Sequence, residues 1–119
     1  MVSLKMNKNS LKDIATEVID LEISALKILK KSINKNFDRA VNSIVDCQSK
    51  IILCGVGKSG LIAAKIASTF SSVGSPAFSL SANDCLHGDL GSITKKDVLI
   101  LISNSGKSEE IIPIIKFAN

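Results

Sequence analysis

The clearest hydrophobic pattern in the chain is a helical one near the N-terminus. Between Ser10 and Asn34, apolar residues recur every three or four positions, which predicts one long amphipathic helix. Ser10 followed by Asp13 is typical of a helix N-cap. Additional apolar residues off the main stripe widen the apolar face, so the helix either contacts a second copy of the protein or packs in an ordinary core. These additional residues are Ile19, Ile23 and Ile28.

The rest of the chain alternates between short apolar runs and helical patterns. Strands are predicted at 51–54, 77–81 and 97–103, helices at about 36–48, 59–73 and 109–119, and a loop at 82–91. Strands that alternate with helices form a parallel sheet with right-handed crossovers. Because three strands are few for such a sheet, we expect the chain to be the N-terminal part of a longer domain. Pro113, near the fifth position of the last helix, predicts a kink or a short first turn.

Composition excludes several classes of function. The net charge of +4 would permit nucleic-acid binding, but Trp and Tyr are absent, so bases would find few stacking partners. Cys47, Cys54 and Cys85 form no C-x-x-C pair, which argues against a disulfide framework and a zinc site. The N-terminus lacks the apolar core of a signal peptide, and no apolar run approaches the length of a membrane span. We therefore expect a cytoplasmic protein with neither a nucleic-acid nor a membrane partner.

A glycine-rich turn follows the first predicted strand. Gly55, Gly57 and Gly60 allow backbone N–H groups to approach a ligand, and the next helix directs its positive end there, which favours phosphate. A Walker A loop would need a glycine at the position of Ile52. The dinucleotide fingerprint matches the three glycines, but no acidic residue ends the second strand at 77–81. Dinucleotide binding therefore stays open as an alternative. The other interpretation, a phosphosugar site, needs a second phosphate loop.

That second loop follows the third predicted strand. Residues 103–108 read Ser-Asn-Ser-Gly-Lys-Ser and lie at the carboxyl end of a parallel strand, where open α/β sheets bind ligands. Hydroxyls and helix-start N–H groups can together surround a phosphate, although Ser108 could be only an N-cap and Ser103 only a strand end. Side chains suited to proton transfer gather around the same edge, and each of them also has a structural explanation. These are Lys58, His87, Glu109 and Glu110.

Three motifs in this order and spacing resemble the sugar isomerase (SIS) domain of arabinose-5-phosphate isomerases. They are Gly-Lys-Ser-Gly at 57–60, Leu-His-Gly-Asp-Leu-Gly at 86–91 and Ile-Ser-Asn-Ser-Gly-Lys-Ser-Glu-Glu-Ile at 102–111. The resemblance runs from about Ser10 to the last residue. It implies a three-layer α/β/α sandwich with a parallel, flavodoxin-like sheet, incomplete here. Residues 1–35 would be an N-terminal helical segment, and 36–119 the N-terminal part of the SIS domain.

The same resemblance implies an activity and a set of site residues. The family interconverts ribulose 5-phosphate and arabinose 5-phosphate, the first step towards the Kdo sugar of lipopolysaccharide, as homo-oligomers that are tetramers in the family and without a cofactor. Glu110 would be the base, Lys58 would stabilise the oxyanion, and His87 would contact the substrate at the catalytic centre. The substrate and phosphate contacts would be Ser59, Gly74, Ser75, His87, Ser103, Asn104, Ser105 and Ser108.

The chain departs from the family pattern in two ways. Family members often carry a histidine followed by a proline where this chain has Ser81 and Ala82. That histidine binds metal in the family, so no metal site is expected here. A further catalytic glutamate and histidine of the family, and a pair of CBS modules, would lie past Asn119, so we expect this stretch alone to be inactive. The rival hypothesis is a phosphosugar-binding regulatory module without catalysis, and replacing Glu110 by Gln would separate the two.

Overall fold

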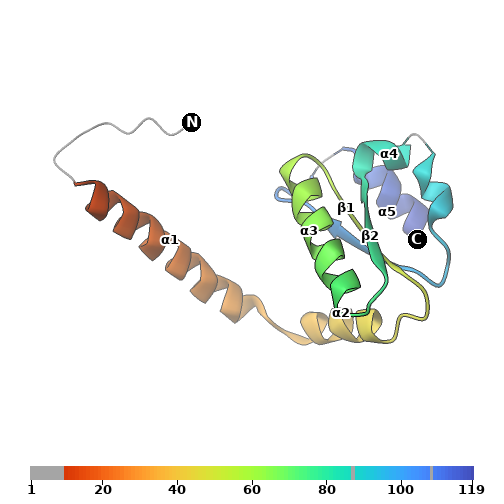
Figure 1. The fold of residues 1–119 in the computed structure, drawn as a ribbon, viewed down its shortest axis with the longest axis horizontal. Helices are drawn as coiled ribbons and strands as arrows, with labels where there is room; N and C mark the ends of the chain where they lie inside the picture. Colours follow the sequence, from red (N-terminus) through yellow and green to blue (C-terminus); the bar gives the residue numbers. More distant parts are fainter. Residues whose placement is uncertain (1–9, 87, 108) are drawn as a thin grey trace. The chain divides into compact units, whose positions relative to one another are not determined.

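A computed structural model describes residues 10–86, 88–107 and 109–119 of the chain (Figure 1). The chain divides into two compact units, residues 1–40 and 41–119. Helix α1 (Leu11–Ser32) makes up most of the first unit, and helix α2 (Lys35–Val45) crosses the boundary. The remaining elements, all in the second unit, are β1 (Ile51–Gly55), α3 (Lys58–Ser72), β2 (Ala77–Ser81), α4 (Ala82–Leu86), the 3₁₀ helix η1 (Asp89–Ser92), β3 (Val98–Ile102) and α5 (Ile112–Ala118).

Helix α1 begins where the sequence pattern places it. The Ser10 side chain accepts a hydrogen bond from the Asp13 N–H at 3.1 Å, which confirms the predicted N-cap. Asp13 lies in the first turn and Lys30 and Lys31 lie in the last, so the charges complement the helix dipole. None of the residues of α1 is buried. The long N-terminal helix is therefore confirmed as an element.

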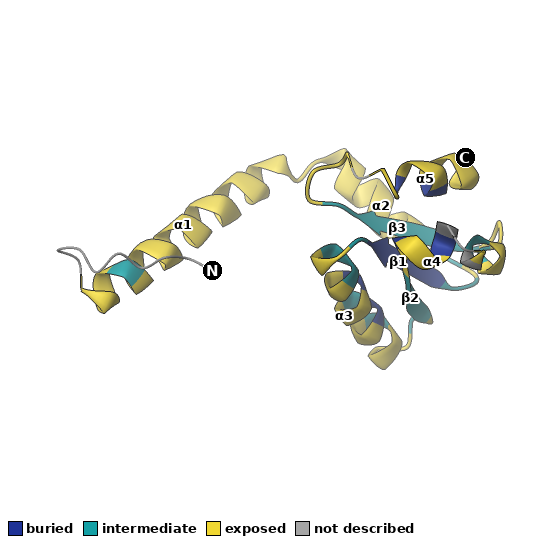
Figure 2. Cartoon of the chain, turned by 90° about the horizontal axis from the view of Figure 1, so that it is seen from above, coloured by how far each residue is buried: buried dark blue, intermediate teal, exposed yellow. Residues whose placement is uncertain are grey.

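The second unit contains a parallel sheet with the strand order β2-β1-β3. Ile51 of the central strand pairs with Ala77 on one side and with Val98 on the other. All five residues of β1 are buried, as Figure 2 shows in dark blue, because helices cover both faces of the sheet. The sequence-based prediction of a buried parallel strand at this position is confirmed.

Residues of β1 enter two separate cores, one on each face of the sheet. Ile51 and Leu53 pack against α3, whose small residues Ala63 and Ala67 are buried and let the helix approach the sheet closely. On the other face Cys54 packs with residues of α4 and α5, among them Ile114, which is fully buried. Helices on both sides of a parallel sheet make the predicted three-layer α/β/α arrangement.

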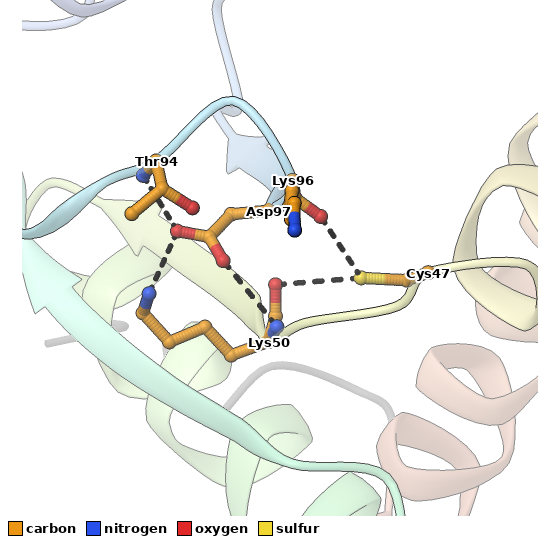
Figure 3. A network of polar contacts seen from close by, with 5 residues as sticks. All are labelled: Cys47, Lys50, Thr94, Lys96 and Asp97. Carbon is orange, nitrogen blue, oxygen red and sulfur yellow. Dashed lines mark hydrogen bonds and ion pairs between the residues drawn. The ribbon is translucent and has the colours of Figure 1, made fainter.

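A buried carboxylate fixes the amino ends of β1 and β3 to each other (Figure 3). Asp97 Oδ2 accepts hydrogen bonds from Lys50 Nζ at 2.8 Å and from the Thr94 N–H at 2.7 Å, and Oδ1 accepts from the Lys50 N–H at 3.3 Å. The Cys47 thiol lies 3.6 Å from the Lys50 carbonyl oxygen and 3.7 Å from that of Lys96. These contacts join the end of α2 and the turn before β3 to the start of the central strand.

Burial of the Asp97 side chain would by itself raise the pKa of the carboxyl. Its hydrogen bonds from Lys50, Thr94 and Ser49 outweigh that effect and hold the pKa well below its usual range. The side chain of Asp97 is fully shielded from solvent, whereas that of Lys50 is partly exposed. The pair therefore favours the charged form of Asp97 in the folded state.

Two predicted boundaries are wrong. Residues 82–91 were expected to be a loop, but 82–86 form α4 and 89–91 belong to η1. The Ser81 hydroxyl caps α4 by accepting from the Asp84 N–H at 3.0 Å. The last helix begins at Ile112 and not near residue 109. Pro113 therefore lies in the first turn, where its missing N–H has no helical partner to lose, and no mid-helix kink is needed.

Candidate functional site at the carboxyl edge of the sheet

The carboxyl ends of the three parallel strands meet at one edge. Gly55, the last residue of β1, pairs with Ser81 of β2 and with Ile102 of β3. The segments that leave these strands therefore start side by side, and the glycine turn after β1 and the serine loop after β3 lie next to each other. Crevices at this edge of an open α/β sheet are the usual ligand sites.

The first loop depends on two glycines for different reasons. A Cβ on Gly55 would lie only 2.6 to 2.8 Å from backbone atoms of Ser59 and Gly60, so the first turn of α3 can approach the strand end only because the side chain is absent. Gly57 has a φ of 57° and precedes α3 directly. Among the described residues no side chain caps the start of α3. The positive end of α3 therefore faces the loop without a side-chain acceptor.

The second loop uses its own hydroxyl groups to hold its shape. Ser103 Oγ accepts from the Gly106 N–H at 2.9 Å, and Ser105 Oγ accepts from the Lys107 N–H at 3.1 Å. Gly106 completes the turn with a φ of 69°. Sequence reasoning missed this role, although a serine three residues before a glycine is a known turn signal. The Ser105 hydroxyl, which accepts in this way, can in addition donate its proton to a phosphate oxygen.

The predicted polar residues lie at different depths along this edge. Lys58 is the first residue of α3 and is exposed, and Ser59 next to it is half-buried. Ser103 is half-buried, whereas Asn104 and Ser105 are exposed. His87 and Ser108 lie outside the described residues.

The two glutamates predicted for this edge lie in the turn between the serine loop and α5. Glu109 and Glu110 are both exposed. Within the part of the chain that the structure describes, no hydrogen bond or ion pair joins Lys58 to Glu110. The structure thus brings the loops that carry the predicted base and the predicted cation to one edge, without a direct contact between these side chains.

Gly74 and Ser75 lie at the opposite edge of the sheet. They connect α3 to the amino end of β2, and the Pro76 carbonyl oxygen beside them accepts from the Ile51 N–H at 2.9 Å. Both residues line a cavity of about 360 Å³ together with the end of α2 and Ile51. This structure does not bring them together with the loops at 55–60 and 103–107.

Two thiols that the sequence left unassigned meet beneath the carboxyl edge. The Sγ atoms of Cys54 and Cys85 are 4.0 Å apart, and both side chains are buried. Burial, with a smaller contribution from the neighbouring Cys85, raises the pKa of the Cys54 thiol to about 12, so it stays protonated at neutral pH.

No group of three His, Cys, Asp or Glu residues suited to a metal ion occurs within 10–86, 88–107 and 109–119. In the same ranges, no helix is both long and apolar enough to cross a membrane.

Comparison with known proteins identifies similar chains. The family model described as the SIS domain matches residues 44–119. An uncharacterised protein of Rickettsia prowazekii, RP505, is 43% identical over 114 residues, which cover 96% of this chain and 36% of that protein. The arabinose 5-phosphate isomerase KdsD of Francisella tularensis is 49% identical over 108 residues, which cover 86% of this chain and 33% of that enzyme.

A solved structure agrees with these sequence matches. The E. coli CFT073 protein c3406, in complex with arabinose 5-phosphate, superimposes with a TM-score of 0.78 at 38% identity, over 91% of this chain and 61% of that one. This chain thus spans about a third of the length of the curated relatives it matches.

Proposed function

This chain belongs to the SIS domain family, and from that premise we propose that it binds a phosphosugar and supplies part of the active site of a phosphosugar isomerase. The proposed reaction is the interconversion of ribulose 5-phosphate and arabinose 5-phosphate. The similarity to KdsD enzymes and to a protein in complex with arabinose 5-phosphate supports this choice of substrate. In the cell the reaction would be the cytoplasmic first step towards the Kdo sugar.

The observation that carries the proposal is the pairing of two glycine-containing loops at the carboxyl ends of adjacent parallel strands. Gly55 at the end of β1 pairs with Ile102 at the end of β3, so the loops at 55–60 and 103–107 leave the sheet side by side. A phosphate dianion needs several donors and a positive potential. Here, α3 directs its positive end to this edge, and Lys58 adds a cation.

The proposed phosphate ligands come from these two loops alone. They are Ser59, Ser103, Asn104, Ser105 and Ser108, because hydroxyl and amide groups can donate to phosphate oxygens without adding charge. Gly74 and Ser75 are left out of this phosphate site because they lie at the other edge of the sheet. His87 is proposed as a further substrate contact, from the resemblance alone.

The proposed chemistry is an aldose-ketose exchange through a cis-enediol. Glu110 removes the proton from C2 of the aldose, the C2–H electron pair forms the C1=C2 bond, and the C1=O π electrons move to O1, which takes up a proton from water. The enediol then gives the O2 proton to water as the C2=O bond forms, and the C1=C2 π electrons take the proton back from Glu110 to form the new C1–H bond. Lys58 stabilises the oxyanion that develops on the sugar during each transfer. Glu110 is assigned this role from the family resemblance, and its carboxylate lies exposed in the turn after the phosphate loop.

The test compares two neighbouring carboxylates in the native polypeptide. Its intact mass is measured first, and the assay uses that polypeptide, whether its mass is 12.6 kDa or larger. Glu110→Gln is expected to lower turnover roughly 10²–10⁴-fold while phosphosugar binding stays within a few-fold, since a general base contributes about that much. Glu109→Gln, in the same turn, is the matched control and should retain turnover.

Two results would count against this assignment. Unchanged turnover in Glu110→Gln would remove Glu110 from the mechanism. If the native polypeptide binds the phosphosugar but catalyses no isomerisation at all, the enzyme hypothesis is wrong. The rival hypothesis of a phosphosugar-binding regulatory module then takes its place.

A further inference from the structure

Cys54 and Cys85 form a pair of buried thiols on two different elements of the second unit. They are 31 residues apart in the sequence, but their Sγ atoms lie only 4.0 Å apart. Neither is in a disulfide, and their exposed fractions are 0% and 1%. A disulfide needs an S–S distance of about 2.05 Å, so the two sulfurs have to approach each other by about 2 Å. The pair is therefore close enough for a bond to form after a small movement of one element.

The element able to make that movement is α4. Cys54 belongs to the central strand β1, which is paired with β2 on one side and with β3 on the other. Cys85 belongs to α4, which has only five residues and follows β2 directly. A helix of this length is marginal by itself and depends on its packing and on its cap, the Ser81 hydroxyl that accepts from the Asp84 N–H. We therefore expect α4 to shift or open more readily than β1.

The closed structure protects both thiols. The thiolate is the form of a cysteine that reacts with oxidants, and burial raises the pKa of the Cys54 thiol, so this group is both protonated and shielded. Opening of α4 would bring Cys85 to solvent while Cys54 stays in the sheet. Oxidation would then begin at Cys85, at a rate that follows how often α4 opens. Cys54 would complete the bond when α4 closes again.

We propose that Cys54 and Cys85 form a reversible disulfide when the protein is exposed to a peroxide. With α4 open, the Cys85 sulfur attacks one oxygen of hydrogen peroxide, the O–O bond breaks, and the released hydroxide takes up the thiol proton as water, which leaves a sulfenic acid. With α4 closed, the Cys54 sulfur attacks the Cys85 sulfur, the S–O bond breaks, and the departing hydroxide takes up the Cys54 proton as water. A thiol reductant restores both thiols by exchange. The bond forms whether or not the chain binds a phosphosugar.

Peptide mass spectrometry tests which thiols react. The native polypeptide is treated with hydrogen peroxide, the remaining thiols are alkylated, and the protein is digested with trypsin. Digestion leaves Cys47, Cys54 and Cys85 on separate peptides, 40–50, 51–58 and 66–95. We expect a link between 51–58 and 66–95, with the loss of two hydrogen atoms from the intact single chain, and its reversal by dithiothreitol.

Two single variants decide whether the link is specific. Cys85→Ala should abolish it, whereas Cys47→Ala, which removes the partly exposed third cysteine, is the matched control and should retain it. A protein that forms no link between 51–58 and 66–95, or that links mainly through the peptide 40–50, would overturn the proposal.

The rate of oxidation tests the opening of α4. Ser81→Ala removes the hydroxyl that caps this helix, so the disulfide should form roughly fivefold faster, the effect of one N-cap on an opening equilibrium. Ser72→Ala, the matched control, removes a hydroxyl that donates to the Thr69 carbonyl oxygen at the end of α3, and it should leave the rate unchanged. Equal rates for Ser81→Ala and the wild type, or equal acceleration by both variants, would contradict the route through α4.

Discussion

Gly55 lies where α3 comes closest to the sheet, and it offers a test at the level of one methyl group. A Cβ at this position would meet backbone atoms of Ser59 and Gly60 at 2.6 to 2.8 Å, which cannot yield as a flexible side chain would. Gly55→Ala should therefore lower the free energy of unfolding by about 3 kcal/mol, the upper part of the range for overpacked sites.

Gly91 is the matched control for that substitution. A Cβ there would meet no atom within 4 Å, so Gly91→Ala should change the free energy of unfolding by less than about 0.5 kcal/mol. Urea denaturation of both variants provides the comparison. Equal effects of the two substitutions would show that the close approach at Gly55 is absent in solution.

Asp97 makes stability depend on pH. Its folded-state pKa is lowered, so the carboxylate contributes stability that is fully present above the unfolded-state pKa of about 4 and is lost as the pH falls towards the folded-state value. Asp97→Asn should cost about 2 kcal/mol at pH 7, because the charge-assisted hydrogen bonds from Lys50 Nζ and the Thr94 N–H to the carboxylate are weakened or lost. The difference between wild type and variant should shrink at pH 3.

Asp46→Asn is the control for the carboxylate experiment, because Asp46 is exposed. It should change the free energy of unfolding by less than about 0.5 kcal/mol at pH 7 and at pH 3. A gap between wild type and Asp97→Asn that stays constant from pH 7 to pH 3 would rule out the pairing as a source of pH dependence.

Individual site residues could be predicted as far as their chemistry is local. The glycines of the first loop were identified from their spacing, and the close approach at Gly55 gives that spacing a steric reason. The hydrogen bonds within the serine loop were not predicted, since the residues were considered as ligands and not as parts of a turn. The contact of Cys54 with Cys85 could not be predicted, because it depends on how α4 folds back over β1.

At the level of elements, local signals located helices and strands well where they were strong. The cap at Ser10 and the strand at 77–81 were predicted at their observed positions. The polar segment after β2 was mistaken for a loop, because α4 is one short turn held by the Ser81 cap and by the burial of Ala82 and Cys85. The late start of α5 follows from Pro113, which fits the first turn of a helix better than its fifth position.

At the level of the whole molecule, the parallel three-layer arrangement could be predicted because strands and helices alternate along the sequence. The strand order β2-β1-β3 could not be predicted from the pattern alone. Each strand is a short apolar run, and nothing in such a run specifies which strands it pairs with. The position of Gly74 and Ser75 follows from the topology. A segment that leads into a parallel strand lies at the opposite edge from one that leaves it.

The central claim is that the loops after β1 and β3 bind the phosphate of a phosphosugar, and backbone amide chemical shifts test it most directly. Titration with arabinose 5-phosphate should move the amide signals of residues 56–60 and 103–107, and arabinose without phosphate should not. Lys58→Met should weaken binding roughly tenfold, the loss of one charge-assisted contact. Lys65→Met, further along α3, should not. Shifts centred on residues 74–76, or no shifts at either loop, would contradict the account.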